Sequence, residues 1–261
     1  MLKFYEIVSP NTTVGKTARL LGVRGVSHAA VVDDNGVLVS VVSVRDLARY
    51  LLESFEEAGV VERLDLHAVL ETPVIEASSK PPLTVRERKA RECAEIMFSK
   101  HIGFLPVVDE NGALKEACTE LDYAAELLDS KEPARCYATH EIIMGDPGEP
   151  LVEALGFMYE GRVRRLPLRR GGDYYMATMN NLLLFLSRNP HNQSLLREVS
   201  EISTPSPRLS YEEATIGEAA ELILASTERA LLLLDSESLA RAILTERDLL
   251  AAYLGERRRE C

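Results

Sequence analysis

The chain of 261 residues contains no tryptophan and one glutamine, Gln193, and only 6% of its residues are aromatic. A low content of thermolabile residues is a feature of heat-adapted proteins, so the composition indicates a heat-adapted source. No apolar run reaches the roughly 18 residues of a membrane span. The N-terminal residues lack the profile of a signal peptide, and we expect a cytoplasmic protein without membrane association.

Cysteine is also scarce, with four residues at scattered positions. None of their spacings matches a metal-binding or redox motif, and four cysteines do not make a disulfide framework in a chain of this length. We therefore expect small buried or surface thiols. The cysteines are Cys93, Cys118, Cys136 and Cys261.

Positive charge is in deficit, because 30 basic residues face 41 acidic ones and the formal net charge is −11. A broad nucleic-acid-binding face needs clustered Lys and Arg, so this charge disfavours nucleic acid as a partner. It does not exclude a small anionic ligand, since the global field is screened beyond about 8 Å. The sequence has no nucleophile elbow, phosphate-binding glycine loop, zinc helix or kinase motif, and we expect a protein without enzymatic activity.

One pattern occurs four times along the chain. It consists of an apolar strand, an acidic or glycine-containing turn, a second strand, and a Ser or Thr that opens a helix. In the first copy, Ala29–Val32 and Val37–Val42 flank a turn ending in Asn35-Gly36. Asn-Gly and Gly-Gly between such strands are typical of hairpins. The other copies begin at Leu105, Leu166 and Leu231.

Each copy is preceded by a second half with its own helix. In three copies this half starts with an apolar residue and Ser or Thr before Pro, at 7–10, 70–73 and 202–205. Apolar residues spaced three and four apart then predict helices over Val14–Leu21, Val85–Met97, Leu151–Met158 and Ile216–Leu224. The complete unit is an α/β repeat in the order strand, helix, strand, strand, helix.

Each repeat is too short to cover its own sheet, so we expect the repeats to pack in pairs. The segment 130–135, which contains Lys131-Glu132-Pro133, looks like a linker between two halves. The predicted first pair is residues 1–130, with repeats of about 1–65 and 66–130. The predicted second pair is residues 136–261, with repeats of about 136–195 and 196–261.

The chain resembles the cystathionine-β-synthase (CBS) domain family over essentially its whole length, as two tandem pairs of repeats. The marks of the resemblance are the strand Leu105–Asp109 and three helix openings of the form Ser/Thr-x-x-Asp, at Ser43/Asp46, Thr119/Asp122 and Thr245/Asp248. The resemblance implies a regulatory module with pseudo-two-fold pairs that binds adenosine-containing ligands (AMP, ADP or ATP) between paired repeats. An S-adenosylmethionine-type ligand and a ligand-free assembly module remain alternatives.

The Ser/Thr-x-x-Asp openings allow two interpretations. The hydroxyl and the acid are suited to capping the helix. The same carboxylate, at the positive end of the helix dipole, is also suited to accepting hydrogen bonds from both ribose hydroxyls. We expect at least one of Asp46, Asp122 and Asp248 to bind ribose. The third repeat has the hydroxyl, Thr178, but Asn181 replaces the acid.

A basic run, Arg162-Val163-Arg164-Arg165, precedes the first strand of the third copy. Alternation along a strand sends Arg164 and Arg165 to opposite faces. These arginines form either a solvated edge or a phosphate site, and the resemblance implies the phosphate site because the family places basic residues there. We favour a cleft that uses Thr245 and Asp248, with Arg164 or Arg165 reaching in from the paired repeat.

The corresponding positions hold His28 in the first repeat and Arg229 in the fourth. His28 is a candidate for a pH-dependent phosphate contact. No second ligand accompanies it at metal-binding spacing, so we expect no metal site. The resemblance assigns adenine to the leading strand of a unit, here Thr72 and Val74 or Thr204 and Ser206. We expect the paired modules to form a flat disc, from one chain or from a homodimer, that acts on a protein partner unknown from the sequence.

Overall fold

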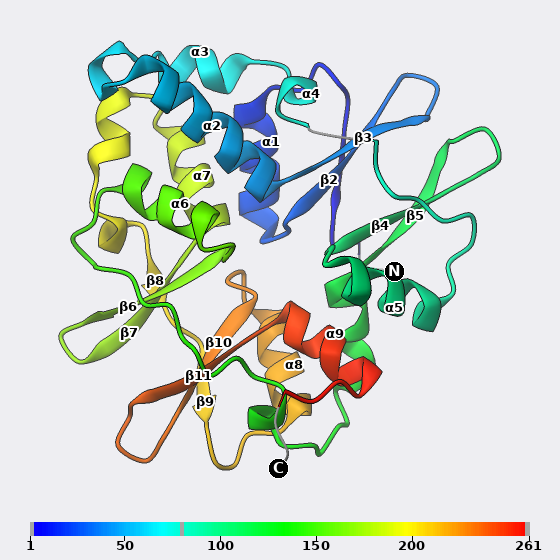
Figure 1. Cartoon of the computed structure of the whole chain (residues 1–261), viewed down its shortest axis with the longest axis vertical. Coiled ribbons are helices and arrows are strands. Elements are labelled where there is room, and N and C mark those ends of the chain that lie inside the picture. Colours follow the sequence, from blue (N-terminus) through cyan, green and yellow to red (C-terminus); the bar gives the residue numbers. More distant parts are fainter. Residues whose placement is uncertain (1–2, 79–80, 259–261) are drawn as a thin grey trace.

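A computed structural model describes residues 3–78 and 81–258. Viewed along the shortest axis of the molecule, four β-hairpins point outward and the helices gather in two groups (Figure 1). The complete unit predicted from the sequence is present in the first and fourth repeats, and its first helix and hairpin occur in all four repeats of this mixed α/β fold.

The first repeat shows how local sequence builds the unit. Thr13 caps the first helix by accepting a hydrogen bond from the Lys16 amide. The helix ends at Gly25, whose φ of 59° is the left-handed conformation that glycine tolerates. Asp33 and Gly36 close the hairpin turn. The elements are β1 (Glu6–Val8), α1 (Val14–Arg24), β2 (His28–Val32), β3 (Leu38–Ser43) and α2 (Val44–Ala58), followed by η1 (Val61–Arg63), α3 (Leu66–Glu71) and α4 (Val74–Ala77).

In the first repeat, β1 is parallel to β2 and β2 is antiparallel to β3. The fourth repeat has the same topology, with β9 parallel to β10 and β10 antiparallel to β11. Its elements are β9 (Arg208–Ser210), α8 (Ile216–Ala225), β10 (Ala230–Leu234), β11 (Ala240–Thr245) and α9 (Glu246–Leu254). The third repeat contains α6 (Leu151–Glu160), β6 (Arg165–Arg170), β7 (Asp173–Thr178) and α7 (Met179–Arg188), then η5 (Asn192–Leu196), η6 (Val199–Glu201) and β8 (Thr204–Pro205).

The second repeat departs from the sequence prediction at both ends. Its leading strand is not at Thr72–Ile75, because Val74 opens the helix α4. Val85 instead bonds to the backbone of β4, so the predicted helix starts later, at Ala90. Thr119 opens 3₁₀ turns and not an α-helix. The elements are α5 (Ala90–Lys100), β4 (Phe104–Val108), β5 (Leu114–Thr119), η2 (Glu120–Tyr123), η3 (Ala125–Leu127) and η4 (Ala134–Cys136).

The repeats are held together through two kinds of apolar contact. Sheets of the first and second repeats meet through Tyr5, Ala30, Phe104 and Ala117, and those of the third and fourth through a similar cluster that includes Met176. Helices cross between the halves, because α1 and α2 pack on α6 and α7, and α5 packs on α9. One chain thus supplies all four repeats, and the division into 1–130 and 136–261 stays a prediction.

The cysteines differ in part from expectation. Cys93 and Cys118 are buried free thiols, as predicted. Cys136 is disulfide-bonded, so the expectation of thiols throughout was wrong for this residue. The prediction for Cys261 falls outside the described residues. Within residues 3–78 and 81–258, no helix is long and apolar enough to cross a membrane.

Candidate functional site

At each predicted helix opening, the Ser or Thr caps the first turn of the helix that follows. The carboxylate Oδ2 of Asp46 accepts hydrogen bonds from the amide (2.8 Å) and hydroxyl (2.6 Å) of Ser43. Thr119 with Asp122 and Thr245 with Asp248 form the same capping box. Thr178 also caps its helix by accepting from the Asn181 amide. Capping is therefore common to all four repeats, and the surroundings of each acid distinguish the sites.

The largest cleft beside one of these acids, which we call the first cleft, has a volume of about 740 Å³. Ser43 and Asp46 lie on it. Its lining has four arginines and two carboxylates, although the chain as a whole is acidic. Its charged and titratable lining residues are Asp46 and Glu120 against Arg45, Arg162, Arg164 and Arg247, with His28 and His101. The segment 81–83, Pro-Pro-Leu, supplies an apolar wall.

A second cleft, of about 250 Å³, lies beside Thr245 and Asp248. Arg164 and Arg165 line it as predicted. Arg162, Arg164 and Arg247 line both clefts. The two clefts therefore share three arginines.

Several predicted site residues line neither cleft. Asp122 lies 3.5 Å from Arg88. Thr178 is buried at 1% exposure. The predicted adenine segments are also elsewhere: the first cleft is lined by 81–83, and the second by Thr139, Glu141 and Ile143. Val74 packs in the core, Thr72 caps α3, Thr204 donates to Glu228, and Ser206 donates to the Pro207 carbonyl.

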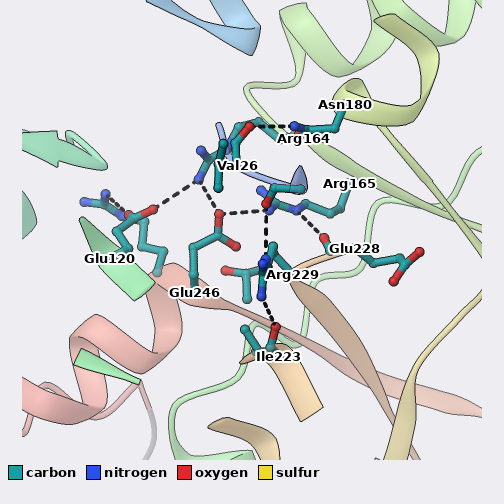
Figure 2. Close-up of polar contacts among 12 residues, drawn as sticks. Val26, Glu120, Arg164, Arg165, Asn180, Ile223, Glu228, Arg229 and Glu246 are labelled. Atoms are coloured by element: carbon teal, nitrogen blue, oxygen red, sulfur yellow. Dashed lines mark hydrogen bonds and ion pairs between the residues drawn. The ribbon is translucent and has the colours of Figure 1, made fainter. Parts of the chain in front are cut away.

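An ion cluster of arginines and glutamates (Figure 2) contributes lining residues to both clefts. Arg164 Nη2 lies 3.2 Å from Glu120 Oε2 and 3.3 Å from Glu246 Oε1. Arg165 also contacts Glu246 and donates to the Glu228 carbonyl at 3.0 Å. Both arginines thus converge on one carboxylate, contrary to the prediction of opposite faces. The reason is that β6 begins at Arg165, so Arg164 precedes the strand and does not obey its alternation.

The charges of the cluster are unevenly balanced. Burial raises the pKa of Glu120 more strongly than Arg164 lowers it. Burial also acts to raise the pKa of Glu246, but Arg165 and Arg164 outweigh it and the pKa is lowered. Glu246 Oε2 is buried and finds no hydrogen-bond partner in the described part of the chain. Glu246 is therefore the carboxylate of the cluster whose charged form the two arginines stabilise.

His28 lies at the edge of the cluster and stacks on Phe104, with ring centroids 5.5 Å apart. Burial, together with the positive charges of Arg164 and Arg165, lowers the pKa of His28 to about 3. The imidazole is therefore neutral near pH 7, which does not favour a phosphate contact that switches in the physiological range, and that contact stays a prediction. A neutral His28 still lines the first cleft and is able to donate one hydrogen bond.

Sequence reasoning missed two glutamates and two arginines, Arg247 on both clefts and Arg258 on the second. Glu120 and Glu246 follow the capping Thr in the second and fourth repeats, and this shared position was the available signal. Arg258 contacts Asp248 from a segment that follows the last helix. Arg229, predicted as a phosphate-site position, instead donates to the backbone carbonyls of Gly25, Ile223 and Leu224. No cluster of three or more possible metal ligands occurs among residues 3–78 and 81–258.

Comparison with known proteins shows similarity to CBS-domain proteins. A family profile described as CBS domain matches residues 1–53. An uncharacterised 33.4 kDa protein in a ribosomal RNA operon of Thermofilum pendens is 29% identical over 249 residues, which cover 88% of this chain and 81% of that protein. Protein MJ1225 of Methanocaldococcus jannaschii is 24% identical over 263 residues, or 94% of each chain.

Solved structures agree over the full chain. The crystal structure of MJ1225, a proposed archaeal homolog of g-AMPK, superposes with a TM-score of 0.80 at 22% identity and covers 97% of both chains. An uncharacterised conserved protein from Pyrococcus horikoshii has a TM-score of 0.59 at 18% identity, with 87% of this chain and 91% of that chain covered. These likenesses establish the fold.

The first 53 residues thus match the CBS-domain profile, and the chain as a whole has the fold of MJ1225. The resemblance read from the hairpins and helix openings is thereby confirmed. The relatives come from archaeal and heat-adapted sources, in agreement with the composition.

Proposed function

We propose that this chain is a regulatory module, without catalytic activity of its own, that binds an adenosine nucleotide in the first cleft. Asp46 accepts hydrogen bonds from the ribose hydroxyls. Arg162, Arg164 and Arg247 hold the phosphates, and the segment 81–83 packs against the base. The observation that carries the proposal is the placement of one capping carboxylate and three arginines on the same 740 Å³ cleft.

The chemistry of the cleft favours a nucleotide over an uncharged or cationic adenosine compound. Guanidinium groups bind phosphate through paired hydrogen bonds, and the cations of the first cleft outnumber its two carboxylates. The sulfonium of S-adenosylmethionine would be repelled by the same arginines. A ligand-free assembly module has no need for exposed cations such as Arg162, which forms no ion pair among the described residues.

The position of the cleft supports a regulatory role. It is lined from all four repeats, because Asp46 belongs to the first, Gly103 to the second, Arg164 to the third and Arg247 to the fourth. A ligand that bridges these repeats stabilises one relative arrangement over others, and only such a difference in affinity shifts a conformational equilibrium. We expect a partner protein to respond to that arrangement.

Calorimetric titration with AMP, 2′-deoxy-AMP and S-adenosylmethionine tests the proposal. Asp46→Asn should weaken AMP binding about tenfold to a hundredfold, since a charge-assisted hydrogen bond contributes about 1.5–3 kcal/mol. It should also abolish the preference for AMP over 2′-deoxy-AMP. Asp122→Asn is the matched control, because Asp122 forms the same capping box away from both clefts.

Equal loss of AMP affinity in both variants would show that the acids act only as caps. Absence of binding by every adenosine compound would favour the assembly module, and preference for S-adenosylmethionine would favour the thioether class. Recovery of unchanged AMP or ATP after long incubation with the protein checks the absence of catalysis.

A further inference from the structure

The segment after the last helix, residues 255–258, folds back toward the second cleft; we call it the return segment. Gly255, at φ 79°, reverses the chain, and the Glu256 amide donates to the Ala251 carbonyl at 2.9 Å. The Arg258 amide then donates to the Cys136 carbonyl, also at 2.9 Å. The backbone of this segment is therefore tied both to α9 and to the start of the third repeat.

The two arginine side chains of the return segment contact different residues. Arg257 lies outside the second cleft and bonds to Glu132 at 2.8 Å and to the Tyr137 hydroxyl at 3.4 Å. Arg258 lines the cleft and donates through Nε and Nη2 to Asp248 Oδ1, at 3.2 and 3.0 Å. Two neighbouring arginines thus offer a matched comparison, one inside the cleft and one outside.

Asp248 has both carboxylate oxygens engaged. Its Oδ2 accepts from the amide and hydroxyl of Thr245, as in the other capping boxes. Its Oδ1, the oxygen that faces away from this cap, is occupied by Arg258. Asp248 is only 2% exposed, whereas 47% of the Arg258 side chain is exposed. The guanidinium therefore covers the carboxylate on its solvent side, where a ribose would have to approach.

None of residues 255–258 lines the first cleft, so the return segment acts on the second cleft. The two clefts share Arg162, Arg164 and Arg247 but differ threefold in volume, about 740 against 250 Å³. Both clefts have an acid and these cations, and at the second cleft the guanidinium of Arg258 lies on the acid.

We propose that the return segment closes the second cleft, with Arg258 occupying the ribose position on Asp248, so that the protein binds one adenosine nucleotide until Arg258 is displaced. The proposal rests on the proposed function, because it uses the same ribose-binding role of the capping acid. Apparent affinity falls by the fraction of molecules in which the cleft is open, and a contact that keeps the cleft mostly closed hides a competent site. Movement of this segment would be the regulated step.

Calorimetric titration of the full chain with AMP, without reductant so that the Cys136 disulfide persists, tests the inference. The wild-type protein should bind one AMP per chain, and Arg258→Gln should bind two. Arg257→Gln should remain at one. The second site should be lost again in Arg258→Gln/Asp248→Asn, whereas Asp46→Asn should remove only the first site.

The two proposals fail in different ways. Binding of one AMP that depends on Asp46, with Arg258→Gln still at one, would overturn the inference and leave the proposed function intact. Weaker binding in Arg258→Gln would also overturn it, since Arg258 would then be a ligand contact. Two sites in the wild-type protein would show that the segment does not close the cleft. No AMP binding by any variant would overturn both proposals.

Discussion

The guanidinium Nη2 of Arg165 lies 2.8 Å from Glu246 Oε1, and only 5% of each side chain is exposed. Arg165 comes from the third repeat and Glu246 from the fourth, so the pair crosses the interface between them. Arg164 extends the contact to Glu120 of the second repeat. Ion pairs thus join the second, third and fourth repeats at this point, whereas the main clusters of buried side chains are apolar.

Removing one partner of this pair should be far more damaging than removing both. Arg165→Met leaves a buried carboxylate with less compensation, and we expect a loss of about 3–5 kcal/mol in unfolding free energy. Arg165→Met/Glu246→Gln should be more stable than the single variant. Urea denaturation of both proteins checks this. Arg91→Met, which removes an exposed pair with Glu95, should change stability by less than about 1 kcal/mol, and an equal effect at both sites would contradict the prediction.

Arg162 should distinguish phosphate binding from adenosine binding. Its φ of 53° is left-handed, so Arg162→Asn removes the charge with a residue that tolerates this conformation. We expect AMP and ATP to bind about tenfold or more weakly, and adenosine to bind as before. Fluorescence-detected or calorimetric titration measures both. The control is Arg169→Asn on β6, away from both clefts. A parallel loss of adenosine affinity would mean that Arg162 shapes the cleft and does not bind phosphate.

His28 should make the protein less stable at mildly acid pH. Its folded-state pKa of about 3 lies below the ordinary value of 6.5. Between these pH values the imidazole is protonated in the unfolded chain and neutral in the folded one. The contribution of His28 to the free energy of unfolding is fully present above pH 6.5 and declines as the pH falls toward 3. Between pH 7 and pH 5 the expected loss is about 2 kcal/mol.

His28→Asn should flatten that decline, and denaturant unfolding at both pH values measures the difference. Burial raises the pKa of the nearby Glu120, whose protonation acts in the opposite direction in both proteins. Identical pH profiles of the wild type and His28→Asn would show that the histidine is not held neutral.

Replacement of Gly25 by alanine should destabilise the protein more than replacement of the hairpin glycine Gly36. A Cβ there would lie 2.7 Å from the Thr227 carbonyl oxygen, in addition to requiring a φ of +59°. Gly36 also has a positive φ, +80°, but nothing lies within 4 Å of the place that a Cβ would take. Gly36→Ala should therefore cost about 1–2 kcal/mol from conformation alone, and Gly25→Ala distinctly more. Thermal unfolding compares them, and equal shifts in Tm would contradict the proposed close approach.

The local features of the fold could be predicted from the sequence. Hairpins such as Asp33–Gly36 depend on turn residues a few positions apart, and the capping boxes depend on residues three apart. The α/β repeat and its family could be predicted for this reason. The leading segment of the second repeat was misplaced, because Val74 begins a short helix. Val85 instead pairs with the β4 backbone, and this pairing with a strand about 20 residues away is not encoded by a local pattern.

The site was decided by contacts that no local pattern contains. The sequence by itself determined that Asp46, Asp122 and Asp248 cap helix starts, because each cap is made within three residues. Only the tertiary structure decided that Asp46 lies on a large cationic cleft, that Asp122 lies beside Arg88, and that Asp248 is covered by Arg258. The physical reason is that burial and ion pairing depend on which repeats pack together, and the three identical motifs carry no information about their neighbours.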